Sequence, residues 1–293
     1  MIHFFATFTW DPDRNFFIIP YIDHPVTWYG FLFALGFAVG YSLIRKMFKK
    51  LLLIGRSSLE IEAATDRLSD RITGSAIVGS LIGARLGHVF FYEWPYYKMH
   101  PLSILKIWEG GLASHGAAVG ILLALIFFVL WNRPSFKELT FLTVLDLIVV
   151  TTPFVGGCIR IGNFINQEIT GIPTSLPWGI TFLHPIDGIA GVPVHPVQLY
   201  ESFFYFFTFA LLWWVWKRHS ESVGRGLLSG IFFILVFGFR FGIELLKMPQ
   251  NLLFDQATGL KMGQLLSLPM ILAGFALLLF YMRSRRHISV SPS

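Results

Sequence analysis

One segment of the chain reads Phe141-Leu-Thr-Val-Leu-Asp-Leu-Ile-Val-Val-Thr-Thr-Pro-Phe-Val155 and continues directly as Gly156-Gly-Cys-Ile-Arg-Ile-Gly-Asn-Phe-Ile-Asn-Gln-Glu-Ile-Thr-Gly171. The first part is apolar enough to lie in a membrane. The second part crowds five polar side chains into nine residues, namely Arg160, Asn163, Asn166, Gln167 and Glu168. Such groups are costly near hydrocarbon and are usually kept there for a function. The glycines between them let backbone come close, so the segment indicates a site for an anionic lipid headgroup.

The composition places the whole chain in a membrane. Of its 293 residues, 54% are hydrophobic and only 14% are charged, whereas soluble domains carry about 25% charged residues. The net charge of +6 would suggest nucleic acid as a partner in a soluble protein. Here the enrichment of Lys and Arg in cytoplasmic loops explains it better, and we expect no nucleic-acid partner. The N-terminus lacks the basic start of a signal peptide.

Seven apolar segments of roughly spanning length predict an all-α integral membrane protein, a single polytopic domain over residues 1–293. We expect spans at about 26–44, 73–92, 112–131, 139–157, 199–216, 227–246 and 264–282. A small extracytoplasmic head segment, 158–198, is expected between the fourth and fifth spans. It contains five prolines, so turns or short strands are expected there rather than one long helix.

The distribution of Lys and Arg predicts the orientation. Fifteen of the 23 lie in connections on one side of the expected spans, six lie on the other side, and Arg85 and Arg240 lie within spans. The more basic side is normally cytoplasmic. We therefore expect the N-terminus outside and the C-terminus in the cytoplasm. The sequence shows no internal repeat, which weakens a transporter interpretation.

Two charged residues, Arg240 and Glu244, lie within the sixth expected span. Their i, i+4 spacing puts both on one helix face. One interpretation is an internal ion pair that only neutralises two embedded charges. The other is a phosphate site, in which the guanidinium offers a fork of donors and the carboxylate orients it.

Other polar residues in or beside the spans also have two interpretations. Arg85 lies among small residues, where interhelical hydrogen bonding is the simpler explanation; Asp146 is a candidate partner for it, which the sequence leaves open. His115 is either an interfacial residue or a proton acceptor. Tyr29 suits an interfacial aromatic belt. For His195, at the entry to the fifth span, loop packing is the simpler explanation.

No metal or cofactor motif is visible in the sequence. There is no His-Glu-x-x-His helix, no phosphate loop and no nucleophile elbow. Cys158 is the only cysteine, so it has no partner for a disulfide or a zinc site. A small packing residue is its better interpretation.

Several segments, taken together and in order, resemble the prolipoprotein diacylglyceryl transferase family. They are Trp28-Tyr29-Gly30, Gly83-Ala-Arg-Leu-Gly87, Gly110-Gly-Leu-Ala-Ser-His-Gly116, Arg160 to Gly171, His195-Pro-Val-Gln-Leu-Tyr-Glu201, Arg240 with Glu244, and Met262-Gly-Gln-Leu-Leu-Ser-Leu-Pro-Met270. The resemblance covers almost the whole chain. Ile159 departs from the family's usual glycine before the signature arginine, so the local turn is expected to differ. Val236 stands where some relatives carry a tyrosine.

The resemblance implies an enzyme of the bacterial inner membrane that acts in the first step of lipoprotein maturation. Such enzymes move the diacylglyceryl group of phosphatidylglycerol to the lipobox cysteine thiol of a preprolipoprotein, forming a thioether and releasing glycerol phosphate. The implied partners are phosphatidylglycerol, preprolipoprotein signal peptides and membrane lipids, and no cofactor is implied. The alternative is a carrier or flippase for an anionic lipid or phosphate compound. A membrane scaffold would not need the embedded charges.

The resemblance also implies roles for individual residues. Catalysis would fall to His115, Arg160 and Arg240. The arginines would stabilise the charge that develops on the leaving phosphate, and His115 would take the proton of the substrate thiol. The phosphatidylglycerol headgroup would be bound by Tyr29, Arg160, Asn163, Glu168, Gly171, Arg240 and Glu244.

Overall fold

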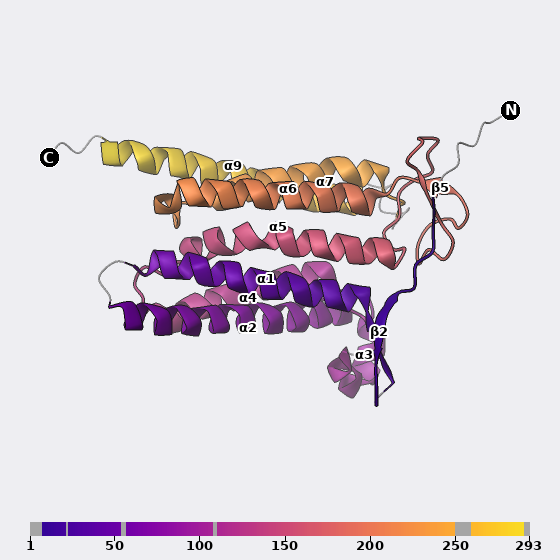
Figure 1. Cartoon of the computed structure of the whole chain (residues 1–293), viewed down its shortest axis with the longest axis horizontal. Helices are drawn as coiled ribbons and strands as arrows, with labels where there is room; N and C mark the ends of the chain where they lie inside the picture. The colour runs from indigo at the N-terminus through magenta and orange to yellow at the C-terminus, as the bar shows by residue number, and fades with distance from the viewer. Residues whose placement is uncertain (1–7, 22, 54–56, 108–109, 250–258, 290–293) are drawn as a thin grey trace. The chain divides into compact units, whose positions relative to one another are not determined.

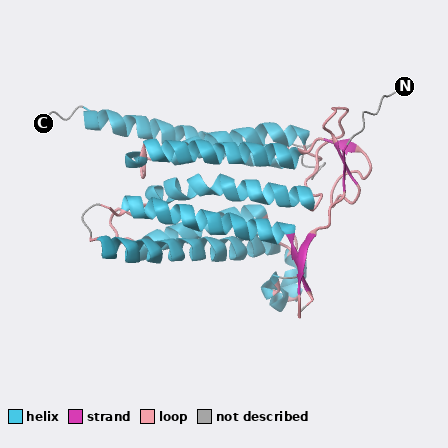
Figure 2. Cartoon of the chain, in the orientation of Figure 1, coloured by secondary structure: helices cyan, strands magenta, loops and turns pink. Residues whose placement is uncertain are grey.

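The computed structural model describes residues 8–21, 23–53, 57–107, 110–249 and 259–289. The chain forms two compact units: unit 1 contains residues 1–40 and 146–293, and unit 2 contains residues 41–145. Most of the described residues are helical (Figure 2). Figure 1 labels the helices and strands.

Unit 2 is built on two long helices that pack closely together. Its elements are the second half of α1 (Trp28–Leu51), α2 (Ser58–Phe91), α3 (Trp94–Met99), the 3-10 helix η1 (Pro101–Leu105) and α4 (Ser114–Asn132). A Cβ atom added at Gly83 would lie 2.7 Å from the Cα atom of Gly120. The backbones of α2 and α4 therefore touch, as small residues permit between membrane helices.

Helix α2 begins at Ser58, whereas the apolar pattern predicted a start near residue 73. Ser57 and Glu60 form a capping box that starts the helix. Arg45 of α1 then pairs with Glu62 at 2.9 Å and with Asp66 at 2.6 Å. These contacts stabilise a charged segment as helix. Most of the connection that we expected between the first two spans therefore forms the first four turns of α2.

Unit 1 contains the remaining long helices and all the strands. The helices are the first half of α1, most of α5 (Phe141–Ile165), α6 (Val197–Arg218), η3 (Ser220–Ser222), α7 (Leu227–Ile243), η4 (Glu244–Leu246) and α9 (Met262–Ser289). Helix α5 continues eight residues beyond the expected end at 157. Arg160 and Asn163 are therefore helical, and so is Ile159, which was expected to change a local turn.

Asp146 of α5 caps the start of α7 and does not pair with an arginine. Its carboxylate accepts hydrogen bonds from the backbone N–H groups of Gly224, Gly226 and Ser229 at 2.9, 3.0 and 2.9 Å, and from the Ser229 hydroxyl at 2.6 Å. A carboxylate at a helix N-terminus satisfies free donors and complements the helix dipole. The pairing of Asp146 with Arg85 left open by the sequence is thus wrong.

The helices support the prediction of a multi-pass membrane protein. Within the described part of the chain, six are long and apolar enough to cross a membrane: Trp28–Leu52, Ser58–Phe91, His115–Asn132, Phe141–Ile165, Leu227–Leu246 and Met262–Ser284. Helix α6 covers the fifth expected span, 199–216, but is not among them. It carries Gln198 and Glu201 and many Trp and Tyr residues, so seven spans stay a prediction.

The strands form two small sheets in unit 1. Strand β1 (Phe8–Trp10) pairs parallel with β4 (Ile180–Phe182), which pairs antiparallel with β5 (Pro193–Val194). Strands β2 (Asn15–Ile19) and β3 (His24–Thr27) form a hairpin. The three-stranded sheet packs its buried side chains against the end of α5, through Phe164, Phe182 and Trp10. This packing holds the segment after α5 in place over the last turn of that helix.

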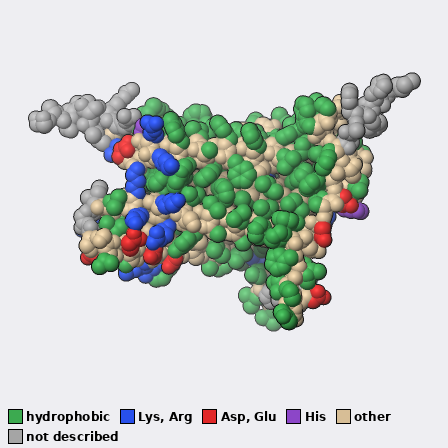
Figure 3. Space-filling model, in the orientation of Figure 1, with side chains coloured by type: hydrophobic (Ala, Val, Ile, Leu, Met, Phe, Trp, Pro, Cys, Tyr) green, Lys and Arg blue, Asp and Glu red, His purple; other side chains and the backbone are tan. Residues whose placement is uncertain are grey.

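Basic side chains mark one end of the unit 2 helices. Figure 3 shows Lys and Arg gathered where α1 ends and α2 begins, while apolar side chains cover the middle of the helices. Lys49 and Lys50 lie in the last turn of α1. Such a basic helix end is typical of the cytoplasmic face of a membrane protein.

Candidate headgroup site

Arg160 is the centre of a polar cluster at the end of α5. Its side chain is only 13% exposed. Its Nη1 donates to Asn163 Oδ1 at 3.0 Å, and its Nε lies 3.0 Å from Glu201 Oε2. The guanidinium also interacts electrostatically with the Tyr205 hydroxyl. Two residues of α6, one helical turn apart, thus hold an arginine of α5 that a bilayer would otherwise disfavour.

Amide side chains connect Asn163 to Glu168. Asn163 Nδ2 donates to Glu168 Oε1 at 2.8 Å, and Asn166 Nδ2 donates to the same oxygen at 3.2 Å. Gln198 of α6 donates to the backbone carbonyl of Glu168 at 2.8 Å. Glu168 therefore fixes the Asn163 amide with its oxygen toward Arg160.

The chain reverses sharply after α5, and this turn places Glu168. Gln167 has a φ of 57°, in the left-handed region, and Ile169 has the same φ. Gln167 is held there because its side chain accepts from the backbone N–H of His184 at 2.8 Å and donates to Asp11 at 3.2 Å. A left-handed residue at a helix C-terminus folds the chain back over the last turn.

Tyr29, at the start of α1, lies against the same cluster. A Cβ atom at Gly162 would be 2.7 Å from Tyr29 Cδ2, so only a glycine lets α1 approach α5 this closely. The Tyr29 hydroxyl interacts electrostatically with Glu168 and Arg160. The structure thus brings together four of the residues that the sequence predicted for one site: Tyr29, Arg160, Asn163 and Glu168.

A buried lysine joins Glu201 to Glu244. Lys247 Nζ lies 2.9 Å from Glu201 Oε1 and 3.3 Å from Glu244 Oε2. Lys261 Nζ donates to the backbone carbonyls of Glu244 and Lys247 at 2.9 and 2.6 Å. Burial lowers the pKa of Lys247, and the neighbouring Glu201 carboxylate opposes that shift. Sequence reasoning missed Lys247, although it lies three residues after Glu244.

Arg240 has no anionic partner within the described part of the chain. The ion pair with Glu244 that its i, i+4 spacing suggested does not form, because Glu244 pairs with Lys247 instead. Arg240 interacts electrostatically with Tyr205, which places its charge near the Arg160 cluster. The interpretation in which Arg240 and Glu244 only neutralise each other is therefore wrong.

Two glycines make room at the site. A Cβ atom at Gly263 would lie 2.5 Å from the Glu244 carboxyl group, and one at Gly171 would clash with the backbone carbonyl of His195. The N–H of Ile172 donates to the Leu246 carbonyl at 2.8 Å. Gly171 thus lets the turn after α5 pair with the segment that carries Lys247. A direct contact between Gly171 and a headgroup stays a prediction.

His195 and Cys158 pack as the sequence suggested. His195 Nδ1 lies 3.4 Å from the Tyr200 hydroxyl, which also accepts from Trp178 at 2.8 Å. Cys158 is buried in α5, 3% exposed.

Two further predicted residues belong to unit 2. The His115 ring, at the start of α4, contacts the rings of Phe91 and Tyr92 with centroids 5.7 Å apart in each case. Arg85 is buried and donates to five backbone carbonyls, those of Ser103, Ile104, Lys106, Gly110 and Gly111. Arg85 thus anchors the segment between α3 and α4. The sequence suggested hydrogen bonding between spanning helices at a close-packed face, whereas these acceptors lie in η1 and in the connection before α4.

Comparisons with known proteins agree on one family. Residues 17–280 match the family model described as prolipoprotein diacylglyceryl transferase. Three curated relatives are named phosphatidylglycerol–prolipoprotein diacylglyceryl transferase. The relative from Protochlamydia amoebophila is 35% identical, with 94% of this chain and 95% of the relative covered. The relative from Porphyromonas gingivalis is 39% identical (94% and 94%), and that from Tolumonas auensis is 42% identical (87% and 90%).

Proposed function

This chain belongs to the prolipoprotein diacylglyceryl transferase family, and we propose that it transfers the diacylglyceryl group of phosphatidylglycerol to the lipobox cysteine thiol of a preprolipoprotein. The substrate sulfur attacks the glycerol carbon that carries the phosphate. The carbon–oxygen bond breaks, glycerol phosphate leaves with the bonding electrons, and a thioether forms. The thiol proton goes to a base. No protein nucleophile is required by this sequence of bonds.

The single observation that supports this reaction best is that Arg240, among the described residues, has no carboxylate partner, while it lies near a cluster in which Arg160 and Lys247 are paired with carboxylates. Glu201 is shared by Arg160 and Lys247, and Glu244 is held by Lys247. Among the residues that the structure describes, Arg240 is therefore the guanidinium of this cluster that no carboxylate occupies, and we infer that it receives a further anion. A phosphate diester matches the geometry of such a donor fork.

Arg160 has a different role in the proposal. Glu201, Asn163 and Tyr205 fix its side chain, so its charge is preorganised. Fixed donors near the leaving phosphate stabilise the charge that develops in the transition state without rearrangement. Tyr29, Asn163 and Glu168 orient Arg160 and the headgroup, and Tyr205 is added to the residues that the sequence predicted.

His115 remains our candidate for the base that takes the thiol proton. A thiol has a pKa near 8.5 in water, and its thiolate is the reactive form. A base therefore raises the reactive fraction near neutral pH. The proposal places the outer ends of the spans, with the site, on the extracytoplasmic side, with the N-terminus outside and the C-terminus in the cytoplasm. A single domain with seven spans belongs to the same proposal.

The test measures diacylglyceryl transfer by the purified protein. The protein in detergent is mixed with phosphatidylglycerol labelled in its acyl chains and with a lipobox peptide, beside a matched peptide that carries serine for the cysteine. The proposal expects label on the cysteine peptide alone, with glycerol phosphate released in equal amount. A protein that moves labelled lipid between leaflets of vesicles but never labels the peptide is a carrier, and this result would overturn the proposal.

A further inference from the structure

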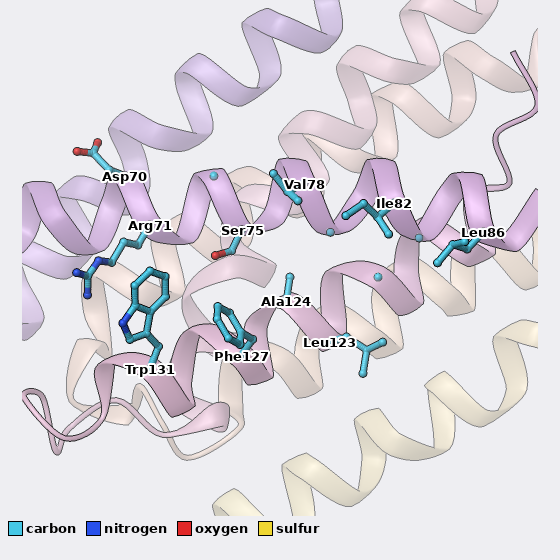
Figure 4. Close-up of a pocket in the computed structure, with 14 residues that line it drawn as sticks. Asp70, Arg71, Ser75, Val78, Ile82, Leu86, Leu123, Ala124, Phe127 and Trp131 are labelled. Atoms are coloured by element: carbon cyan, nitrogen blue, oxygen red, sulfur yellow. The ribbon is translucent and has the colours of Figure 1, made fainter. Parts of the chain in front are cut away.

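Unit 2 carries a groove of about 590 Å³ between α2 and α4, remote in the chain from the residues of the headgroup site. Figure 4 shows the two helices side by side with the groove's side chains between them. The lining is almost entirely apolar along its length and becomes polar at one end. The lining includes Asp70, Arg71, Gly74, Phe127 and Trp131.

Glycines create the groove. A Cβ atom at Gly79 would lie 2.6 Å from Ala124 Cβ, so the helices touch along this line. Gly74 lies one turn and a half earlier, and a Cβ atom there would meet nothing within 4 Å. The floor is thus bare backbone, flanked by side chains that stand outward: Val78, Ile82, Leu123 and Phe127 are 55, 55, 61 and 58% exposed.

The polar end of the groove is built around Arg71. Its Nη1 donates to Asn132 Oδ1 at 2.6 Å, and its guanidinium lies 4.6 Å from the centroid of the Trp131 ring. Asn132 is itself fixed, because its Nδ2 donates to the Phe128 carbonyl at 2.8 Å. Within the described residues, Arg71 has no carboxylate partner. Its neighbour Asp70 points away from Arg71 (Figure 4) and accepts from the Tyr41 hydroxyl at 2.8 Å.

We propose that this groove binds a glycerophospholipid, with one acyl chain along the glycine floor and the phosphate on Arg71. From Ser75 to Leu86 the helix rises about 16 Å, at about 1.5 Å per residue. One leaflet of hydrocarbon is about 15 Å thick. The groove is therefore as long as the acyl chain of one leaflet. The headgroup would lie at the basic end of unit 2. There Arg71, which has no carboxylate partner among the described residues, can donate to a phosphate.

Trp131 fits the same occupant. Tryptophan is enriched at the level of lipid headgroups because its ring is apolar and its N–H is polar. Trp131 is 56% exposed and lines the groove beside Arg71. The two residues thus mark the level at which hydrocarbon gives way to headgroup.

The test uses native mass spectrometry of the purified full chain, delipidated in detergent and titrated with phosphatidylethanolamine or diacylglycerol. Phosphatidylethanolamine is chosen because the proposed reaction does not name it as substrate. Gly74→Leu adds a side chain to the open floor, where a Cβ atom meets nothing within 4 Å, and Arg71→Gln removes the charge. Gly238→Leu is the matched control, since a Cβ atom at Gly238 also meets nothing within 4 Å and that residue does not line the groove.

The parent protein and the Gly238→Leu variant are expected to retain one bound phosphatidylethanolamine molecule, which the Gly74→Leu variant should lack. Arg71→Gln should bind it at least about tenfold more weakly, and diacylglycerol should bind as weakly to the parent. If Gly74→Leu and Gly238→Leu retain phosphatidylethanolamine equally, the lipid does not bind in the groove. If the parent retains diacylglycerol as well as phosphatidylethanolamine, the phosphate contact with Arg71 is wrong. A second measurement does not depend on the Gly74→Leu variant. Brominated phosphatidylethanolamine should quench the tryptophan fluorescence of the parent protein more than that of Trp131→Phe. Identical quenching in the two proteins contradicts the proposal.

Discussion

The Lys247 ammonium lies 2.9 Å from the Glu201 carboxylate, and both side chains are almost completely buried. The other oxygen of Glu201 lies 3.0 Å from Arg160 Nε without the alignment of a hydrogen bond. One carboxylate of α6 thus holds two cations, one from α5 and one from the segment after α7. Among the described residues of the site, this sharing leaves Arg240 without a carboxylate partner.

Glu201→Gln is expected to destabilise the protein strongly. The substitution leaves Arg160 and Lys247 buried with too little negative charge, and removing one partner of a buried pair costs about 3–5 kcal/mol. Thermal unfolding in detergent measures the loss. The control is Glu221→Gln, because Glu221 is 67% exposed and lies 3.5 Å from His219, so its loss should cost no more than about 1 kcal/mol. Equal unfolding temperatures for the two variants would show that the shared carboxylate is not structural.

Gly263→Ala is expected to lower activity while the fold remains. The added Cβ atom would lie 2.5 Å from the Glu244 carboxyl group, so that carboxylate must shift from the position in which it pairs with Lys247. We expect transfer to fall by about tenfold, which is 1.4 kcal/mol of barrier, with an unfolding temperature close to that of the parent. Gly238→Ala is the control, since its Cβ atom meets nothing within 4 Å. A Gly263→Ala protein as active as Gly238→Ala would remove Glu244 from the site.

His115→Gln is expected to bind phosphatidylglycerol as the parent does but to transfer it slowly. If His115 takes the thiol proton, the defect should shrink as pH rises from 6 to 9, because more of the substrate thiol ionises unaided above its pKa of about 8.5. Lipid binding and peptide labelling are measured separately at each pH. A defect that is constant with pH argues against a base, and a variant that loses binding too places His115 in headgroup recognition.

The predicted orientation can be tested with single thiols, because Cys158 is the only cysteine and is buried. Ser175→Cys lies in the connection between α5 and α6, and Ser135→Cys lies in the connection between α4 and α5. Both side chains are exposed. In intact cells whose outer membrane has been made permeable, a membrane-impermeant maleimide should label Ser175→Cys and not Ser135→Cys. The reverse pattern would invert the orientation and move the site to the cytoplasmic side.

The sequence predicted the helices well where apolar runs are long, because a bilayer requires about 20 such residues. It failed where charged residues continue a helix. The first turns of α2 were expected in a connection, since the sequence alone does not show that Arg45 neutralises Glu62 and Asp66. The last turns of α5 were missed for a similar reason, because Glu201, the carboxylate that pairs with Arg160, lies on α6.

The candidate site was predicted in part. Tyr29, Arg160, Asn163 and Glu168 were expected together and lie together. The pairing of Arg240 with Glu244 was wrong, because spacing on a helix gives the face but not the partner, and Lys247 competes for the same carboxylate. Tyr205 and Lys247 were missed. An i, i+4 match between Glu201 and Tyr205 on α6 is the signal that could have found one of them.

The central claim is that Arg240 binds the phosphate through its guanidinium fork, and Arg240→Lys tests it most directly. Lysine keeps the charge but not the paired donors. The measurement is kcat/KM for transfer from phosphatidylglycerol to a lipobox peptide, beside Arg160→Lys and the control Arg218→Lys in the last turn of α6. We predict a fall of at least about tenfold, roughly 1.4 kcal/mol, for Arg240→Lys and Arg160→Lys, with Arg240→Lys as stable to heat as the control. A kcat/KM for Arg240→Lys equal to that of Arg218→Lys would contradict the account, because positive charge alone would then be enough.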